Sequence, residues 1–217
     1  MPHITAIGEI LFDVYNNYKK LGGAPFNFIH HIKKLSGYGN FVSRIGNDEY
    51  GDEIMEFFGR KNIPTHYLQK DIEHPTGRAL ANLDDKKIPH WEIEKNCAYD
   101  FIEMNKNIEN LIKDTDCLYF GTLAQRNSVS RNTIQSLFNK EIEYFCDLNI
   151  RQQFYTKEII EHSLKTTNAL KLNEDELILL NKLLLDVNYE LISSAVRLKN
   201  DYNVDLLCVT CGEKGSY

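Results

Sequence analysis

The fold of this chain is decided by the segment Leu207-Cys208-Val209-Thr210-Cys211-Gly212-Glu213-Lys214-Gly215. The segment indicates a buried strand that runs into a glycine turn. An α/β protein usually holds a ligand phosphate at such a turn, because successive backbone N–H groups converge there on an anion. Helices normally cover both faces of a parallel sheet, and no helix follows this strand in the sequence. We therefore expect a chain truncated within a larger α/β domain.

Upstream of this segment, apolar runs of strand character alternate with stretches whose apolar residues recur at helical spacing. The strands are expected at Ile4 to Gly8, Phe41 to Ile45, Cys117 to Phe120, Ile142 to Cys146, Ala169 to Leu172 and Leu206 to Thr210. The helices are expected at Phe26 to Leu35, Asp52 to Arg60, Val129 to Phe138, Lys157 to Leu164, Asp175 to Leu184 and Tyr189 to Asn200. This alternation predicts βαβ units and a mostly parallel sheet with helices on both faces.

Length, composition and charge limit the class of protein. With 217 residues, 42% of them hydrophobic, the chain can bury one large core, so we expect a single domain over residues 1–217. The formal net charge of −6 leaves no broad basic surface for nucleic acid. The start Met1-Pro2-His3-Ile4 lacks the features of a signal peptide, and no apolar run approaches the length of a membrane span. We expect a cytoplasmic protein with no nucleic-acid or membrane partner.

The five cysteines, an odd number without a secretion signal, indicate reduced thiols. Cys208 and Cys211 form a C-x-x-C pattern, which is either a redox or zinc pair or a pair of small apolar residues on a strand. The second alternative is favoured, because positions i and i+3 of a strand point to opposite faces. The adjacent His30 and His31 cannot both face one ion from a helix, so no protein metal cage is expected.

The segment Thr76 to Glu94 breaks the α/β alternation. It reads Thr-Gly-Arg-Ala-Leu-Ala-Asn-Leu, a turn at Asp84-Asp85-Lys86-Lys87, and then Ile-Pro-His-Trp-Glu-Ile-Glu. This pattern predicts a hairpin with mixed faces, and a hairpin inserted into an α/β core often serves as a lid. The excursion from Leu11 to Lys20 is a candidate to pair with it.

Two candidate ligand-binding groups lie near the N-terminus. In Gly22-Gly23-Ala24-Pro25-Phe26-Asn27 the paired glycines allow a ligand close to the backbone, and the Asn27 amide can donate and accept hydrogen bonds. Asp13 follows the first strand, at the carboxyl edge where open α/β sheets bind ligands. Its carboxylate can accept from two neighbouring hydroxyls of a polyol. The alternatives are a flexible helix start and a solvated loop acid.

Two further groups follow later strands. Asp147, Asn149 and Arg151 repeat with period two, so an extended backbone would place all three on one face. Asn173 and Glu176 form an N-x-x-E pattern, which is typical of a helix capping pair. A carboxylate at that edge of the sheet is equally suited to the water shell of Mg²⁺, and the two interpretations are compatible.

Taken together, the motifs of this chain resemble those of the ribokinase-like, or PfkB, family of carbohydrate kinases, in the same order and over almost the whole chain. The motifs are Gly22-Gly23-Ala24-Pro25-Phe26-Asn27, Arg44-Ile45-Gly46-Asn47-Asp48 with Gly51, Asp147-Leu148-Asn149-Ile150-Arg151, Asn173 with Glu176, and Val209-Thr210-Cys211-Gly212 with Gly215. Two more segments, Gly8-Glu9-Ile10-Leu11-Phe12-Asp13 and Gly121-Thr122-Leu123-Ala124-Gln125, favour the fructokinase branch.

The resemblance implies a three-layer α/β/α sandwich with an inserted β-lid at about 11–20 and 76–94, its C-terminal part missing. It implies transfer of the γ-phosphoryl group of ATP, with Mg²⁺, to fructose or a similar sugar. The implied sugar-binding residues are Asp13, Gly23 and Asn27; Asn173, Thr210, Gly212 and Gly215 are implied for ATP, and Glu176 for the metal. The resemblance also suggests a homodimer formed through the lid.

The chain departs from the family pattern at its end. Members carry a Gly-Ala-Gly-Asp-like helix start, whose N–H groups stabilise the transferring phosphate and whose Asp is the catalytic base. That motif is expected beyond Tyr217, so we expect no catalytic residue within the chain and no kinase activity from it. Two alternatives remain: a kinase of the same fold for ribose, a nucleoside or a keto-acid sugar, or a non-catalytic sugar-binding module.

Overall fold

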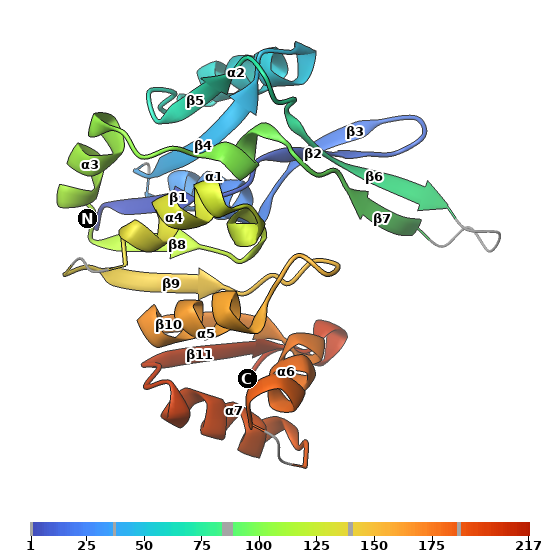
Figure 1. The fold of residues 1–217 in the computed structure, drawn as a ribbon, viewed down its shortest axis with the longest axis vertical. Helices are drawn as coiled ribbons and strands as arrows, with labels where there is room; N and C mark the ends of the chain where they lie inside the picture. The colour runs from blue at the N-terminus through green and yellow to red at the C-terminus, as the bar shows by residue number, and fades with distance from the viewer. Residues whose placement is uncertain (1, 37, 84–88, 139–140, 186–187) are drawn as a thin grey trace.

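The computed structural model describes residues 2–36, 38–83, 89–138, 141–185 and 188–217, and it shows a mixed α/β fold with two sheets (Figure 1). The large sheet has the order β11-β10-β9-β8-β1-β4-β5, and all of its neighbouring strands are parallel. Its strands are β1 (Ile4–Ile7), β4 (Asn40–Gly46), β5 (Leu68–Asp71), β8 (Cys117–Phe120), β9 (Glu143–Asp147), β10 (Ala169–Asn173) and β11 (Leu206–Thr210).

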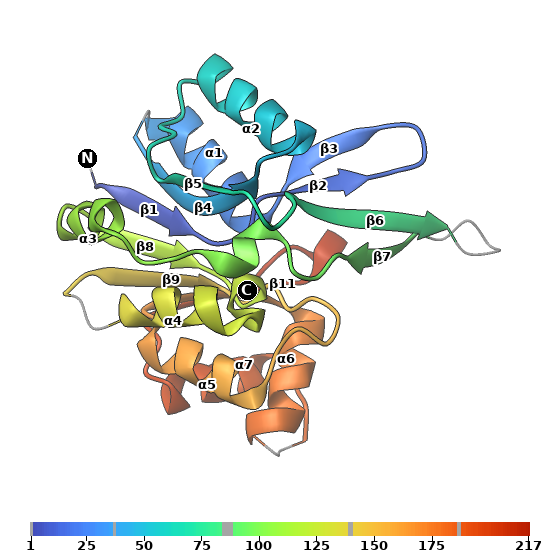
Figure 2. The same ribbon diagram turned by 45° about the horizontal axis from the view of Figure 1, so that its top comes forward.

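Seven α-helices among the described residues flank the large sheet. They are α1 (Ala24–Ser36), α2 (Glu49–Arg60), α3 (Lys106–Lys113), α4 (Ser128–Ser136), α5 (Lys157–Thr166), α6 (Glu174–Leu180) and α7 (Leu191–Asp201). Figure 2 shows α1 and α2 on one side of the sheet and α4, α5, α6 and α7 on the other. The parallel sheet with helices on both faces, predicted from the alternation of apolar runs, is therefore present.

The helices begin where the sequence supplies a capping side chain. Asp48 caps α2 by accepting a hydrogen bond from the Gly51 N–H at 2.8 Å. Thr156 caps α5 by accepting from Ile159 N–H at 3.3 Å. Each cap satisfies a backbone donor that has no partner within the helix, typically for about 1 kcal/mol. The apolar faces of these helices then pack on the sheet and supply most of the stability.

The two faces of the large sheet carry two separate cores. The larger core contains residues of α3 to α7 with Leu118, Leu172 and Val209 of the strands. The smaller core joins α1 and α2 to Ala6 and Phe41, and it contains no buried residue of β10 or β11. Helices among the described residues therefore cover β4 and β1 on both faces, whereas β10 and β11 are covered on one face only.

The prediction that residues 206–210 form a buried strand is wrong in one respect. β11 has the predicted bounds, but Val209 is its one buried residue, and Leu206 is 65% exposed. The physical reason is its position at the edge of the sheet, where β10 is its neighbour on one side and the Tyr217 backbone pairs with Val209 on the other.

The small sheet has the order β3-β2-β6-β7 and projects from the end of the large one (Figure 1). It consists of β2 (Leu11–Val14), β3 (Lys19–Gly22), β6 (Gly77–Leu83) and β7 (Pro89–Ile93). β6 and β7 pair antiparallel, and β2 pairs with β6 in parallel. The expected turn at 84–87 lies outside the described residues.

A hydrogen-bonded cluster joins the small sheet to the large one. The Thr76 hydroxyl, buried just before β6, donates to Asp48 Oδ1 at 2.7 Å and accepts from the Gly46 N–H at 3.0 Å. Asp48 Oδ2 also accepts from the Thr76 N–H at 2.8 Å. A Cβ added to Gly51 would lie 2.1 Å from Gly46 O, so only glycine allows this approach. The cluster fixes the start of β6, in the small sheet, against the end of β4, in the large sheet.

Candidate functional site

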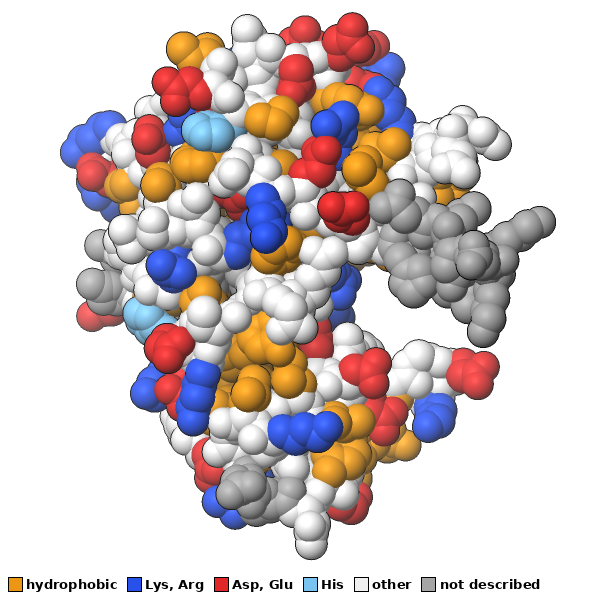
Figure 3. All heavy atoms as spheres, turned by 45° about the vertical axis from the view of Figure 1, so that its right-hand side comes forward, with side chains coloured by type: hydrophobic (Ala, Val, Ile, Leu, Met, Phe, Trp, Pro, Cys, Tyr) orange, Lys and Arg blue, Asp and Glu red, His pale blue; other side chains and the backbone are white. Residues whose placement is uncertain are grey.

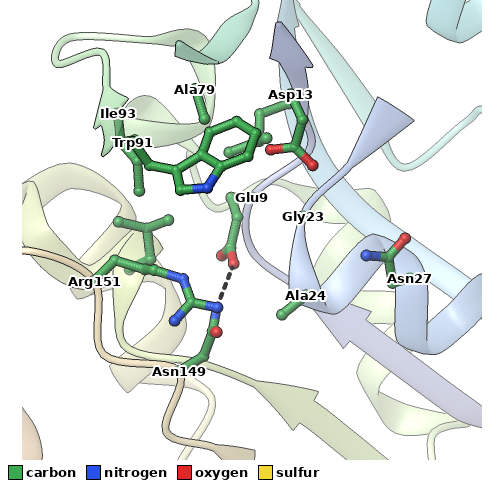
Figure 4. A pocket seen from close by; sticks show the side chains of 12 residues that line it. Glu9, Asp13, Gly23, Ala24, Asn27, Ala79, Trp91, Ile93, Asn149 and Arg151 are labelled. Atoms are coloured by element: carbon green, nitrogen blue, oxygen red, sulfur yellow. Dashed lines mark hydrogen bonds between the residues drawn. The ribbon is translucent and has the colours of Figure 1, made fainter. Parts of the chain in front are cut away.

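A cavity of about 390 Å³ lies at the carboxyl edge of the large sheet, against the small sheet. Figure 3 shows the molecule hollowed between the projecting small sheet and the part of the surface below it. Segments far apart in the sequence line the cavity: the residues after β1, strands β2, β6 and β7, the start of α1, the turn after β8, and the loop after β9. Its lining includes Glu9, Asp13, Gly23, Asn27, Asn149 and Arg151, with Trp91 from β7 (Figure 4). This is where open α/β sheets bind ligands.

Asp13 and Asn27 line the same cavity, as does Gly23 between them in sequence. Asp13 lies on β2 and is half-buried. Burial raises the pKa of its carboxyl, while the positive charges of Lys20 and Arg151 oppose that rise. Asn27 is exposed in the first turn of α1, where its backbone N–H donates to Gly23 O at 2.9 Å. The predicted sugar-binding residues are thus brought together by the fold.

Gly23 has a structural reason to be glycine. Its φ is +108°, and a Cβ at this position would lie 2.5 Å from Glu9 O and 3.2 Å from Ile10 Cα. The backbone between β3 and α1 therefore packs directly on the backbone after β1. That close approach brings the start of α1 to the wall of the cavity.

Glu9 is a site residue that the sequence did not single out. It is 1% exposed, and its carboxyl faces the cavity (Figure 4). Burial raises its pKa to about 7; nearby backbone N–H groups of Glu9 and Ala24 oppose the rise, and the charge of Asp147 adds to it. The available signal was an acid directly after a buried strand and beside Gly8, whose φ is +147°.

The prediction that Asp147, Asn149 and Arg151 share one face is wrong. Asn149 has φ of 45°, so the backbone after β9 leaves the extended conformation. Asn149 and Arg151 line the cavity, whereas Asp147 accepts hydrogen bonds from the Tyr119 hydroxyl at 2.8 Å and from Lys171 Nζ at 2.9 Å. Asparagine tolerates this left-handed conformation better than most residues.

Asn173 and Glu176 form the capping pair at the start of α6. Asn173 Oδ1 accepts from the Glu176 N–H, and Glu176 Oε2 accepts from the Asn173 N–H, both at 2.8 Å. Glu176 Oε1 accepts from the Ile150 N–H at 2.7 Å, which ties α6 to the loop after β9. Burial raises the pKa of Glu176, partly offset by these two N–H donors.

Thr210, Gly212 and Gly215 lie at the end of β11, apart from the cavity lining. Gly212 and Gly215 have φ of +59° and +89°, and an added Cβ at either would meet no atom within 4 Å. The turn is closed by its own bonds: the Cys211 N–H donates to Gly215 O, and the Gly215 N–H donates to Gly212 O. β10 places Asn173 beside Thr210 in register, so these candidate nucleotide residues share one stretch of the sheet edge.

The described residues contain no group of three His, Cys, Asp or Glu side chains placed to hold a metal ion. All five cysteines are free. In the part of the chain that the structure describes, no helix has the length and apolar character needed to cross a membrane.

The sequence pattern of the pfkB family carbohydrate kinases matches residues 2–217. An uncharacterized sugar kinase of Pyrococcus horikoshii is 22% identical over 211 residues, covering 88% of this chain and 68% of that protein. A fructokinase of Salmonella typhimurium is 23% identical over 203 residues, covering 89% of this chain and 64% of that protein. The chain thus spans about two thirds of the length of these curated relatives.

Solved structures share the fold. The P. horikoshii kinase in complex with ATP superposes with a TM-score of 0.76, covering 98% of this chain and 72% of that one at 22% identity. A Vibrio cholerae fructokinase in a fructose-, ADP- and calcium-bound form superposes with a TM-score of 0.77, covering 100% of this chain and 72% of that one at 20% identity.

Proposed function

Because this chain belongs to the pfkB family of carbohydrate kinases, we propose that its protein transfers a phosphoryl group from ATP to fructose or a closely similar sugar. The observation that carries the proposal is the cavity at the sheet edge, which combines the Asp13 carboxylate and the Asn27 amide with a backbone that approaches closely at Gly23. Adjacent sugar hydroxyls are the ligands such a set of acceptors and donors fits.

In this proposal Asp13 accepts hydrogen bonds from two neighbouring hydroxyls of the sugar, and Asn27 donates to or accepts from a third. The half-buried position of Asp13 strengthens such bonds, because the surrounding dielectric is lower than that of water. Gly23 contributes by leaving room: any side chain there would displace the wall that positions both residues.

We place the nucleotide at Asn173, Thr210, Gly212 and Gly215, at the carboxyl ends of β10 and β11. The P. horikoshii relative with bound ATP supports ATP as the phosphoryl donor. The left-handed glycines allow the loop to approach a ligand closely. Transfer between the two sites then depends chiefly on positioning and charge stabilisation, with a base to take the hydroxyl proton. We assign that base to no described residue.

Glu176 fits Mg²⁺ only through water. Both of its carboxylate oxygens already accept backbone N–H bonds, at 2.7 and 2.8 Å, which leaves one lone pair on each. Mg²⁺ usually keeps several of its waters in a protein site, so a hydrogen bond from Glu176 to such a water suits this geometry. Bound Mg²⁺ would neutralise charge on the phosphates of ATP.

We also propose that the small sheet acts as the lid of the sugar site. Trp91 on β7 lines the cavity, and Gln152 Nε2 donates to the Trp91 carbonyl at 2.7 Å, so the loop after β9 already holds β7 above the site. The exposed Tyr18 stacks on Tyr15, which meets Trp91 edge to face. A second copy of the lid covering these rings would give the homodimer, and light scattering tests it.

A keto-acid sugar is the second candidate substrate. Arg151 lines the cavity and makes no ion pair with a described residue, and a guanidinium suits the carboxylate of a sugar acid. Ribose and nucleosides remain candidates within the same fold. A non-catalytic sugar-binding module would bind the sugar without turnover.

The test is a binding panel followed by an activity assay. Trp91 is the only tryptophan of the chain, so its fluorescence reports on the cavity directly. Titration with fructose, ribose, adenosine and a 2-keto-3-deoxy sugar acid should give the strongest response with fructose. ADP release from MgATP, measured on the longest form of the protein, then separates a kinase from a binding module. Failure of every sugar to bind would refute the proposal.

A further inference from the structure

Glu9 places at the cavity a buried carboxyl oxygen that has no partner in the described part of the chain. Its Oε1 receives one long hydrogen bond, from Asn149 Nδ2 at 3.4 Å, and its Oε2 is buried without a partner among the described residues (Figure 4). The residue is only 1% exposed. Burying a carboxyl group without hydrogen bonds is unfavourable, so a position of this kind needs an explanation.

Among the described residues, the Glu9 side chain ties no other element of the fold by a short hydrogen bond: Asn149 bonds it at 3.4 Å, and the backbone N–H groups of Glu9 and Ala24 act on its carboxyl only enough to oppose part of the rise in its pKa. The contact that holds the start of α1 in place involves the backbone carbonyl of Glu9, which faces Gly23. The side chain forms no ion pair with a described residue. An apolar residue of similar length would keep the backbone contact and remove an unsatisfied oxygen, so stability alone favours a different residue here.

The groups around the carboxyl leave the unpaired oxygen for a ligand. Besides burial, the negative charge of Asp147, on β9, raises the pKa of Glu9, and the positive charge of Arg151, in the loop after β9, lowers it. Burial raises the pKa of the nearby Tyr99 and Tyr119 hydroxyls, and the charge of Glu9 adds to that rise. Asp147 and Tyr119 bond to each other at 2.8 Å. Neither is therefore aimed at Glu9, which lines the cavity together with Trp91 and Asp13.

We propose that Glu9 is a specificity-determining residue, which binds through Oε2 the one sugar hydroxyl that reaches the floor of the cavity. The inference rests on the proposed function and adds to it a residue and a requirement: the substrate must carry a hydroxyl at that position. A site built to bond a hydroxyl discriminates against an analogue that lacks it, because the buried group is then left unpaired.

The protonation state of Glu9 gives the proposal a pH signature. Burial raises the pKa of Glu9 to about 7, and a bound sugar would exclude more water and favour the protonated carboxyl further. The protonated form donates its O–H to the sugar. Sugar affinity should therefore fall as the pH rises from 6 to 9 in the wild type.

Two variants test the proposal. Glu9→Gln keeps the shape and a hydrogen-bond donor but cannot ionise, and Glu9→Met keeps the length but has no donor. We expect Glu9→Met to weaken fructose binding by about 3- to 10-fold and Glu9→Gln by less than about 3-fold, the range of one neutral hydrogen bond. Glu9→Gln should also lose the fall in affinity between pH 6 and 9. The exposed Glu56→Gln on α2 is the matched control.

Monodeoxy analogues of fructose identify the bonded hydroxyl. In the wild type, one analogue should bind about 3- to 10-fold more weakly than fructose, and Glu9→Met should remove the penalty for that analogue alone. Trp91 fluorescence measures the affinities, and thermal unfolding should show both variants at least as stable as the wild type at pH 8. Unchanged fructose affinity in Glu9→Met, or penalties that persist for every analogue, would overturn the proposal. If the wild type binds no sugar, the proposed function fails as well.

Discussion

The turn at Gly22-Gly23 and the turn at Gly212 to Gly215 each contain two glycines, but they differ in structure. At Gly23 a Cβ would meet the Glu9 carbonyl at 2.5 Å, whereas at Gly212 and Gly215 it would meet nothing within 4 Å. Gly23 has a positive φ and also lies where two backbones touch. At Gly212 and Gly215 the positive φ alone favours glycine.

The same contrast extends to the sheet around each turn. β1 and β4, next to Gly23, are covered on both faces, and the cavity beside them is lined from six separate stretches of the chain. β11, next to Gly212, is an edge strand with Leu206 65% exposed. We infer that the proposed sugar-binding cavity is held in place by packing within residues 1–217. The proposed nucleotide-binding turn from Gly212 to Gly215 is held by hydrogen bonds within the turn itself.

The largest expected effect comes from filling the crowded turn. Gly23→Ala adds backbone overlap to an unfavourable φ and should reduce the free energy of unfolding by about 3–5 kcal/mol. Gly212→Ala has only the left-handed backbone to overcome, at about 1 kcal/mol. Urea unfolding of both variants measures the difference. Equal losses would show that close approach does not distinguish the two turns.

The second largest effect is expected from the buried carboxyl of Glu9, beside Gly23, which should make stability depend on pH. Burial raises the pKa of Glu9 from its ordinary 4.5 to about 7, so the folded protein holds this proton more tightly than the unfolded chain. Stability should therefore fall as the pH rises from about 4.5 to 7, by on the order of 3 kcal/mol from this group. Glu9→Gln should be more stable than the wild type at pH 8, and the difference should vanish near pH 4.5. A constant difference at all pH values would contradict this assignment.

Two threonines give a smaller contrast. Thr76→Val removes the hydroxyl that bonds both Asp48 and the Gly46 N–H in a buried position, so it should cost about 1–3 kcal/mol. Thr210→Val removes one long contact, from Oγ1 to Leu172 O at 3.5 Å, and should change stability by less than about 0.5 kcal/mol. Thermal unfolding checks the pair. A larger loss at Thr210 would mean that the end of β11 is held more firmly than its contacts indicate.

The sequence predicted most of the large sheet because its buried strands are continuous apolar runs. It did not predict β5, whose residues Leu-Gln-Lys-Asp become a strand only by pairing with β4 at an edge. It also did not predict α3, an eight-residue helix in a polar stretch whose buried face is formed by Ile108, Leu111 and Ile112. Both elements depend on tertiary contacts that local periodicity does not contain.

The site was predicted in part for a related reason. Asp13 was singled out by its place at the carboxyl edge of the sheet, Gly23 and Asn27 by the paired glycines before a helix, and the sugar-binding role of all three by the family resemblance. Glu9 was not predicted, because an acid after a strand is ordinarily solvated and its burial arises from α1 and the small sheet closing around it. The side chain of Arg151 reaches the cavity because the backbone at Asn149 is left-handed. The sequence analysis assumed an extended backbone there, so it could not predict this.

The central claim is that residues 1–217 contain a formed sugar site in which Asp13 holds the ligand. Calorimetric titration of the chain and of its Asp13→Ala variant with fructose, and separately with MgATP, tests it most directly. Loss of a hydrogen bond to a charged group costs about 1.5–3 kcal/mol, so fructose affinity should fall roughly 10- to 150-fold while the affinity for MgATP stays nearly unchanged. An unaltered fructose affinity in Asp13→Ala, or equal weakening of both ligands, would contradict the claim.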